Sequence, residues 1–570
     1  MSTAPAKEGR WRRHFDWWAE VDGATLRADL QAALLAAVLV LPQGVAYAAL
    51  AGLPLAWGLY AAVVPTAVAA LAGSSRHVLT GPTNAVSLLL AASLAPLAVV
   101  GSAEYLRLAL VLTLMVGALQ LALALSRLGA LTHFISPSVL LGFTGGAAVL
   151  IAAHALQALW ATAVPRLPGL AVAGLTLAAA VLLRWRWRRG PGLLLALLAG
   201  TGLALAAGWA LPSIGALPSA LPPFAPPTVA GNDFARLATA ALALTIVALG
   251  QSIAVAKALA QRSGQALDVN RECLGQGLAN LAGGLCQGFV GCGSINRSMP
   301  HLDAGARTPL AGVLAAACVV VLVALAGPLL ARVPLAAVDA LLLVVAWTLL
   351  DRVQWRDLVR QDRAEAAVAV GTAVATVLLP MPVAVLSGVA ASLVLYLNRT
   401  AHPALRSMGF AAPPQPGVQR PFVVLSAGAP ECPQLKLLRM EGPVWFGAEA
   451  HVADALRSLR EGDDAPRHLL VMSKSMNFLD PAGVALWERE RALRVALGGG
   501  LYFHRPRPEV LAAWQRSGFV ERLGPAHLFA DKRSAIAALV PRLDGERCAR
   551  CRARVFEECA AQPAPPPTGA

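Results

Sequence analysis

The sequence predicts an α-helical polytopic membrane protein with 14 transmembrane segments in two inverted repeats of seven, followed by a small cytoplasmic α/β domain. The chain of 570 residues is 57% hydrophobic and only 14% charged. Its long apolar runs approach the length of about 20 residues that a helix needs to cross a bilayer. Two polar motifs recur at nearly the same spacing in the two halves of the apolar region, which indicates an internal duplication.

The apolar runs define the membrane topology. They lie at 25–50, 54–72, 82–100, 105–126, 136–158, 168–184, 192–211, 234–258, 272–289, 294–303, 308–330, 337–350, 364–380 and 382–398. The Pro-rich loop 217–227 divides them into seven per half. With the N-terminus inside, the basic loops follow the even-numbered spans, as the positive-inside rule requires. An odd number of spans per half makes the two halves inverted.

Composition also sets the domain boundaries that we expect. These are a basic cytoplasmic segment 1–22, repeat 1 at 23–215, an external loop 216–233, repeat 2 at 234–400, a linker 401–432, an α/β domain 433–545 and a tail 546–570. The N-terminal segment has no cleavable signal pattern. The net charge of +15 resides mainly in short loops and tails. No basic face with interleaved aromatics indicates a nucleic-acid partner.

The α/β domain is predicted from short apolar runs that alternate with helical patterns. We expect strands at 435–440, 444–446, 468–472 and 501–503, and helices at 448–459, 484–497 and 509–517. In the tail, Cys548, Cys551 and Cys559 offer three thiols without a nearby fourth ligand, which is a poor metal site. We therefore expect a docking segment there, with no metal and no cofactor.

The motif Gly291-Cys292-Gly293-Ser294-Ile295-Asn296-Arg297 lies between two apolar runs. A Gly-rich turn followed by Ser and Asn is typical of a helix start, whose free N–H groups and positive dipole end attract anions. Arg297 adds a full charge, and an intramembrane Arg marks a functional site by default. The alternative is a surface loop in which Arg297 extends to the interface.

A second motif, Thr80-Gly81-Pro82-Thr83-Asn84-Ala85, also opens an apolar run. An offset of 293 − 81 = 212 residues aligns its Gly and Asn with Gly293 and Asn296. Farther upstream, an offset of 251 − 43 = 208 residues aligns Gln43 with Gln251. Interrupted hydrophobic segments at corresponding places in two halves indicate the central site of a transporter.

Several motifs resemble the sulfate permease (SulP) family of anion transporters. They are Leu41-Pro42-Gln43-Gly44-Val45-Ala46-Tyr47-Ala48, Gly73-Ser74-Ser75-Arg76-His77, Ala279-Asn280-Leu281 and Gly305-Ala306-Arg307-Thr308-Pro309. We expect Arg76 and His77 themselves to be loop residues. The C-terminal motifs Gly442-Pro443-Val444-Trp445-Phe446 and Asp480-Pro481-Ala482-Gly483 resemble a STAS domain.

The resemblance implies a core domain and a gate domain, an elevator-type motion of one against the other, and a homodimer. It also implies that an anion lies between the half-helices of spans three and ten. Carried over to this chain, the substrate-binding positions are Gln43, Tyr47, Thr83, Asn84, Ala85, Gln251, Ile295, Asn296 and Arg297. Of these, Arg297 supplies the nearby charge and Asn296 a polar contact.

The chain departs from the family pattern at two positions. Many bacterial members carry an acidic residue where this chain has Gln251, and a neutral amide binds neither Na⁺ nor a proton by charge. Symport through that position is therefore disfavoured, and anion exchange is favoured. In the STAS-like domain, Ala482 occupies the position of the phosphorylated hydroxyl, which excludes a phospho-switch there.

We therefore expect a secondary transporter of a small inorganic or carboxylate anion in the cytoplasmic membrane, with sulfate, bicarbonate, chloride and dicarboxylates all open. The alternatives are a Na⁺- or H⁺-coupled anion symporter, and a membrane-anchored STAS scaffold that binds a cytoplasmic protein. A nucleobase carrier is disfavoured because an uncharged base does not need Arg297. No nucleophile–base pair or phosphate loop supports an enzyme.

Overall fold

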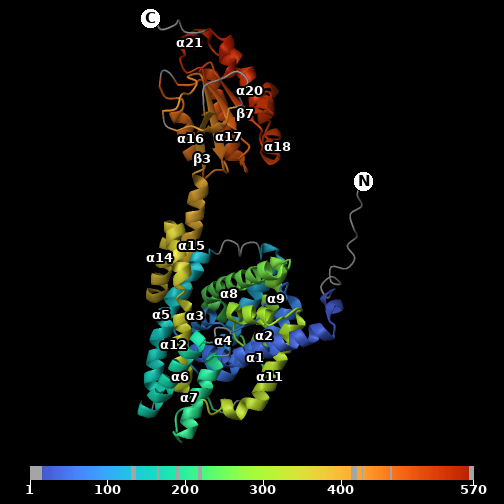
Figure 1. Ribbon diagram of the computed structural model, residues 1–570, viewed down its shortest axis with the longest axis vertical. Helices are drawn as coiled ribbons and strands as arrows, with labels where there is room; N and C mark the ends of the chain where they lie inside the picture. The colour runs from blue at the N-terminus through green and yellow to red at the C-terminus, as the bar shows by residue number, and fades with distance from the viewer. Residues whose placement is uncertain are drawn as a thin grey trace. The chain divides into compact units, whose positions relative to one another are not determined.

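The structure is a computed structural model that describes residues 16–129, 136–162, 166–186, 192–215, 221–411, 420–426, 428–462 and 465–563. The chain forms two compact units, Met1–Ser392 and Leu393–Ala570. The first unit is helical and the second contains a β-sheet (Figure 1).

The first unit contains the helices that the apolar runs predict. They are, after η2 (Asp16–Glu20), α1 (Gly23–Leu50), α2 (Leu55–Ala72), α3 (Asn84–Leu94), α4 (Ala103–Leu125), α5 (Pro137–Thr162), α6 (Arg166–Arg186), α7 (Gly192–Ala206), α8 (Asp233–Ser263), α9 (Val269–Leu285), α10 (Ile295–Asp303), α11 (Leu310–Leu330), α12 (Leu335–Leu349), α13 (Arg352–Gln361), α14 (Arg363–Leu378) and the first part of α15 (Met381–Ala401), whose last residues belong to the second unit. Each of the fourteen predicted runs overlaps one of these helices. The predicted loop after the twelfth run contains the additional helix α13.

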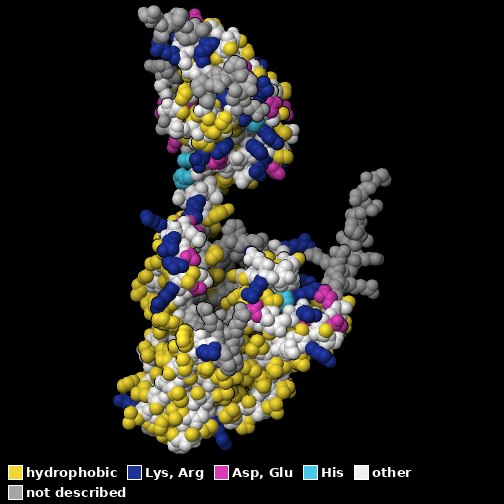
Figure 2. All heavy atoms as spheres, in the orientation of Figure 1, with side chains coloured by type: hydrophobic (Ala, Val, Ile, Leu, Met, Phe, Trp, Pro, Cys, Tyr) yellow, Lys and Arg dark blue, Asp and Glu magenta, His cyan; other side chains and the backbone are white. Residues whose placement is uncertain are grey.

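Eight of the described helices are long and apolar enough to cross a membrane. Helices α3 and α10, of 11 and 9 residues, are too short to do so. Hydrophobic side chains cover the face of the unit over α6, α7 and α11 (Figure 2). Leu167 of α6 and Leu325 of α11 are 85% and 76% exposed. Such an apolar exterior is stable only in contact with lipid or another apolar surface.

Helix packing divides the first unit into two bundles. In the first bundle, α1, α2, α4, α8, α9 and α11 pack on one another, and α3 and α10 pack on α1 and α8. In the second bundle, α5, α6, α7, α12 and α14 pack on one another. Helix pairs in one half correspond to helix pairs in the other half. The pair α1–α11 corresponds to the pair α8–α4, and the pair α1–α10 corresponds to the pair α8–α3. Shifting each element by one repeat of seven spans converts one pair into the other. The packing therefore agrees with the predicted duplication.

The second unit is a six-stranded mixed sheet with helices on both faces. Its strands are β3 (Ala404–Phe410), β4 (Phe422–Val424), β5 (Leu435–Glu441), β6 (His468–Met472), β7 (Gly500–His504) and β8 (Leu528–Phe529), in the order β4-β3-β5-β6-β7-β8. The pairs from β5 to β8 are parallel, and β3 is antiparallel to β4 and β5. Alternation along β6 sends Leu469 and Val471 to one face and Leu470 and Met472 to the other.

The helices of this unit are α16 (Glu449–Ser458), α17 (Pro481–Ala496), α18 (Pro508–Arg516), α19 (Phe519–Leu523), α20 (Lys532–Leu539) and α21 (Gly545–Arg550). Helices α16 to α19 cover one face of the sheet. Helix α20 and the Cys-containing tail cover the other face, where Cys548 and Phe556 join the core. Burial there raises the pKa of the Cys432 thiol to about 11. The tail therefore packs on the sheet.

Two expectations for this unit need correction. Strands β3 and β4 lie within 401–432, which was expected to be a linker. These two strands form the antiparallel edge of the sheet and precede its parallel strands in the chain. The predicted strand at 444–446 is wrong, since only an isolated bridge joins Val444 to Leu479. Asp480 nearby caps α17 by accepting a hydrogen bond from the N–H of Gly483 at 2.8 Å.

A buried ion pair on α17 gives a stability prediction. Arg494 is fully buried and donates to Glu490 at 2.7 Å, and Arg460 donates to the same carboxylate at 2.6 Å. Because Glu490→Gln removes the charge that compensates a buried guanidinium, we expect it to cost about 3–5 kcal/mol. Thermal unfolding of the full-length protein should show this loss. The partly exposed Glu488 provides the control: Glu488→Gln should cost about 1 kcal/mol or less.

Candidate anion site

Two short strands hold the half-helices together. Strand β1 (Thr80–Gly81) precedes α3, and β2 (Cys292–Gly293) precedes α10. They pair in antiparallel register, with Thr80 opposite Gly293 and Gly81 opposite Cys292. The pair brings the N-termini of α3 and α10 to the same part of the unit. The side chains of the N-cap residues Thr83 and Ser294 make no capping hydrogen bond, which leaves N–H groups at both helix starts for a ligand.

Helix α9 fixes this strand pair with polar side chains one turn apart. Gln276 donates to Thr80 Oγ1 at 2.8 Å. Asn280 accepts from the N–H of Gly291 at 2.8 Å and donates to the Gly291 carbonyl at 3.1 Å. Asn280 also donates to Gln120 Oε1 of α4 at 2.9 Å. The two ends of the pair are therefore bound to one rigid helix.

The Asn280 contacts give a second prediction. Asn280→Leu keeps the volume but leaves three buried polar groups without their partner, which should cost about 1–3 kcal/mol for each group left unsatisfied. We expect a lower unfolding temperature and weaker anion binding, because β2 positions α10. Asn232→Leu, at the exposed start of α8, should change neither property. An unfolding temperature like that of the wild type would contradict the role of Asn280.

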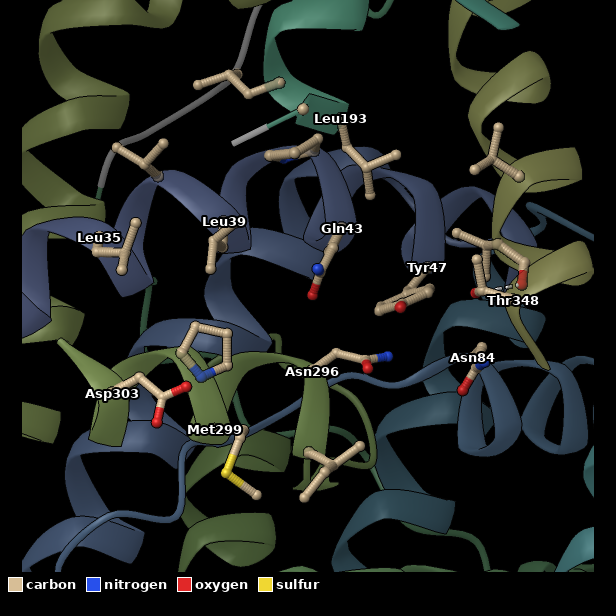
Figure 3. A pocket seen from close by; sticks show the side chains of 18 of the residues that line it. Leu35, Leu39, Gln43, Tyr47, Asn84, Leu193, Asn296, Met299, Asp303 and Thr348 are labelled. Atoms are coloured by element: carbon tan, nitrogen blue, oxygen red, sulfur yellow. Dashed lines mark hydrogen bonds between the residues drawn. The ribbon is translucent and has the colours of Figure 1, made fainter. Parts of the chain in front are cut away.

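A cavity of about 570 Å³ lies beside the two helix starts (Figure 3). Its lining residues come from both bundles: α1, α3 and α10 on one side, and α7 and α12 on the other. Gln43 and Tyr47 extend from α1 toward Asn296 and Asn84 (Figure 3). The cavity continues along α1 to Leu35 and along α10 to Asp303. The cavity therefore lies between the two bundles.

The structure separates the nine predicted site residues into two groups. Five line the cavity: Gln43, Tyr47, Asn84, Ile295 and Asn296. The other four are not among the residues that line it: Thr83, Ala85, Gln251 and Arg297. The N–H of Ala85 donates to Asn84 Oδ1 at 2.8 Å, and that of Arg297 donates to Ser294 O at 3.3 Å. These two backbone donors already have partners in this structure.

Arg297 is enclosed by protein. It is 1% exposed, and within the described residues its Nε, Nη1 and Nη2 atoms have no hydrogen-bond partner. Its guanidinium lies against β1, since a Cβ atom at Gly81 would stand 3.1 Å from Nη2. The Gly at this position therefore makes room for the charge. A buried cation without a carboxylate creates a strong local preference for an anion.

Three side chains form a neutral network behind the helix starts. Gln251 Oε1 accepts hydrogen bonds from Thr83 Oγ1 at 3.4 Å and from Cys292 Sγ at 3.1 Å. Next to it, Ser252 Oγ accepts from the N–H of Gly293 at 2.8 Å. These uncharged hydrogen bonds join α8 to the segments that precede both half-helices.

Sequence reasoning missed Asp303 and Thr348 as cavity residues and Cys292 and Ser252 as supporting residues. Ser252 lies next to Gln251 in the motif that the duplication picks out, so a signal for it existed. Asp303 has its own partner, because it forms an ion pair with Arg262 at 2.7 Å. Nothing in the pattern at Thr348 indicates a site, since it ends an apolar run.

Half-helices that meet at an antiparallel pair inside an apolar helical unit, beside a cavity between two bundles, define a membrane transporter. The chain belongs to the sulfate permease family, whose model matches residues 26–166 and 160–372. Members of this family are transporters of anions and not enzymes. The family assignment confirms the resemblance noted in the sequence.

Curated relatives support the same assignment over most of the chain. A probable sulfate transporter of Mycobacterium tuberculosis is 31% identical over 539 residues, covering 90% of this chain and 95% of the relative. The chloroplastic sulfate transporter 4.1 of Arabidopsis thaliana is 27% identical, covering 92% and 81%.

Solved structures confirm the fold. Murine Slc26a9, an anion transporter in the inward-facing state, matches with a TM-score of 0.82 at 18% identity, covering 95% of this chain and 96% of that one. The transmembrane domain of the cyanobacterial bicarbonate transporter BicA matches with a TM-score of 0.58 at 23% identity, covering 65% and 98%.

Proposed function

We propose that this protein exchanges small inorganic or carboxylate anions across the cytoplasmic membrane, with the anion bound in the cavity at the starts of α3 and α10. One observation carries the proposal: Arg297, in the first turn of α10, is a buried cation that has no hydrogen-bond partner among the described residues. Both the charge and the helix dipoles favour an anion. They discriminate charge better than shape, so the candidates include sulfate, bicarbonate, chloride and dicarboxylates.

The proposed mechanism is of the elevator type. Residues of α1, α3 and α10 contact the anion, whereas α7 and α12 belong to the opposite wall of the cavity. Motion of the first bundle against the second would carry the anion with its binding residues. The neutral Gln251 network supports exchange over Na⁺ symport, because no carboxylate is available there to bind the cation.

Uptake into proteoliposomes tests this function. Labelled sulfate, bicarbonate, chloride and succinate would be offered with and without a Na⁺ gradient and with or without a counter-anion inside. We expect uptake that requires the internal anion and ignores the Na⁺ gradient. Strict dependence on Na⁺ would show that coupling occurs away from Gln251. Uptake that survives deletion of residues 410–570 would argue against a function only as a STAS scaffold.

Asn296 gives a third prediction. Its side chain is exposed to the cavity and faces Gln43, so it can donate a hydrogen bond to an anion (Figure 3). Asn296→Ala removes one such bond, worth about 1.5–3 kcal/mol when the partner is charged, and should weaken anion binding about tenfold or more. The protein should insert and unfold like the wild type. Unchanged uptake by both this variant and Arg297→Ala would remove the cavity from the mechanism.

We further propose a homodimer in the cytoplasmic membrane, with the N-terminus and the sheet-containing unit in the cytoplasm. The distribution of basic loops supports this orientation. A cytoplasmic protein partner would bind the STAS-like unit.

A further inference from the structure

Helix α13 contributes neither to the cavity lining nor to the buried core of the first unit. None of its residues is buried. Only Leu350 and Asp351 separate it from α12, and only Asp362 separates it from α14. These neighbours correspond to the twelfth and thirteenth predicted spans. A helix of 10 residues is about 15 Å long, which is too short for a span of its own. Helix α13 therefore lies where the two spans leave the bilayer.

Trp355 holds α13 against the second bundle. Its ring packs on Gly145 of α5, where an added Cβ atom would stand 3.1 Å from the ring atom Cζ2. The helix also packs on α14. Because α5 and α14 both belong to the second bundle, α13 is part of that bundle and not of the one that carries the half-helices.

The exposed side of α13 carries basic and apolar side chains together. Arg352, Arg356 and Arg360 recur at intervals of four residues, so they form one row along the helix, and all three are exposed. Val353 and Val359 flank this arginine row and are 57% and 50% exposed. Such a surface is typical of a helix in a membrane interface, where apolar side chains meet acyl chains and charged ends meet headgroups.

The arginine row has an excess of positive charge. Arg356 lies 3.5 Å from Asp357, which compensates one charge. Arg352 stacks on the exposed Trp347 ring, with its guanidinium carbon 4.6 Å from the ring centroid. Arg360 forms no ion pair within the part of the chain that the structure describes. Two of the three charges are therefore not paired with a described carboxylate.

Two more carboxylates flank α13, and both act as helix caps. Asp351 accepts hydrogen bonds from the N–H groups of Val353 and Gln354 at 3.1 and 3.0 Å. Asp362 accepts hydrogen bonds from N–H groups at the start of α14. Neither carboxylate forms an ion pair with the arginine row. The excess charge is thus open to a partner outside the protein.

We propose that the arginine row of α13 binds the headgroups of anionic phospholipids, with Val353 and Val359 in the boundary region of the acyl chains. A guanidinium forms paired hydrogen bonds with a phosphate, and an anionic headgroup matches the excess charge of the row. The place of α13 between two spans keeps the row at the depth of the headgroups, which selects a lipid over a soluble partner.

Lipid binding at this helix holds the second bundle in place. Helix α13 packs on α5 and α14 and follows α12, which lines the cavity with Val344, Val345 and Thr348. An anchored second bundle gives the first bundle a fixed wall to move against. This role rests on the proposed elevator mechanism, whereas lipid binding itself does not.

Isothermal titration of the full-length protein in a neutral detergent tests the binding. The probes are dioctanoyl phosphatidylglycerol, dioctanoyl phosphatidylcholine and glycerol 3-phosphate. Each basic residue near an anionic surface strengthens association about fivefold, so we expect the wild type to bind phosphatidylglycerol about tenfold or more tightly than the other two probes. This preference should disappear at about 1 M salt, where the screening length falls to about 3 Å.

The combined variant Arg352→Gln, Arg356→Gln and Arg360→Gln should lose the preference and keep the wild-type unfolding temperature, because all three side chains are exposed. A matched control removes the same charge from exposed positions of the second unit and should bind like the wild type: Arg505→Gln, Arg516→Gln and Arg533→Gln. A preference that survives in the first variant, or that is lost in both, would overturn the lipid site. Equal binding of the two lipids by the wild type would also overturn it. Equal binding of glycerol 3-phosphate would indicate a site for free phosphate instead.

Proteoliposome uptake separates this inference from the proposed function. In an equimolar mixture of phosphatidylglycerol and phosphatidylcholine, the wild type should take up labelled anion several-fold faster than in phosphatidylcholine alone. The combined α13 variant should not respond to the lipid. A wild type that ignores the lipid would overturn the anchoring role. An absence of uptake in both membranes would overturn the proposed function, and the titration would then decide the lipid site.

Discussion

Replacing Arg297 by Met should weaken anion binding by about 10–100-fold while the protein remains at least as stable as the wild type. The loss in binding follows from removal of a charge whose contribution to an anion is about 1.5–3 kcal/mol. The variant should be at least as stable as the wild type because the charge that it removes is buried. A guanidinium that is 1% exposed and has no partner among the described residues is costly to fold around. Met fills a similar volume without that cost.

Three measurements on the same preparation test this result: anion titration, proteoliposome uptake and thermal unfolding in detergent. Arg332→Met is a matched control, because Arg332 is an exposed arginine just after α11. It should change none of the three measurements. If Arg297→Met instead lowered the unfolding temperature and left binding intact, Arg297 would be a structural residue that packs against Gly81.

The fold was predictable because its signals are local. A run of apolar residues identifies a spanning helix wherever it occurs, and Gly, Pro and Ser before Asn84 and Asn296 indicate helix starts. The starts of α3 and α10 confirm that interpretation. The STAS-like unit was predicted less completely. Strand β4 has three residues and pairs only with β3, so its short sequence carries little signal.

The supporting contacts of the candidate site were not predictable from local patterns. Gln251 meets Thr83 across 168 positions of the chain, and Asn280 meets Gly291 through a turn that periodicity does not describe. The burial of a side chain also depends on residues that are far apart in the sequence. The family resemblance implied that Arg297 lies near a bound anion, but the enclosure of Arg297 against Gly81 depends on the pairing of β1 with β2. The assignment of site residues remains a prediction, which the substitutions above test.

Replacing Gln251 by Glu should make anion transport sensitive to Na⁺. Gln251 Oε1 accepts hydrogen bonds from Thr83 and Cys292, and a carboxylate of the same shape can accept both. The new negative charge would lie close to Arg297, whose charge already acts on Cys292. It would offset part of the field that attracts the anion, so we expect uptake without a cation gradient to fall about tenfold, which corresponds to about 1.4 kcal/mol.

A bound Na⁺ would neutralise the new carboxylate and restore the field, so an inward Na⁺ gradient should stimulate uptake by Gln251→Glu but not by the wild type. Gln251→Met separates charge from hydrogen bonding. It removes the acceptor for Thr83 and Cys292 without adding charge, and any loss that it causes should not respond to Na⁺. If Gln251→Glu transports like the wild type in both conditions, the Gln251 network does not sense the charge of the anion site. The choice between exchange and symport would then depend on other groups of the first bundle.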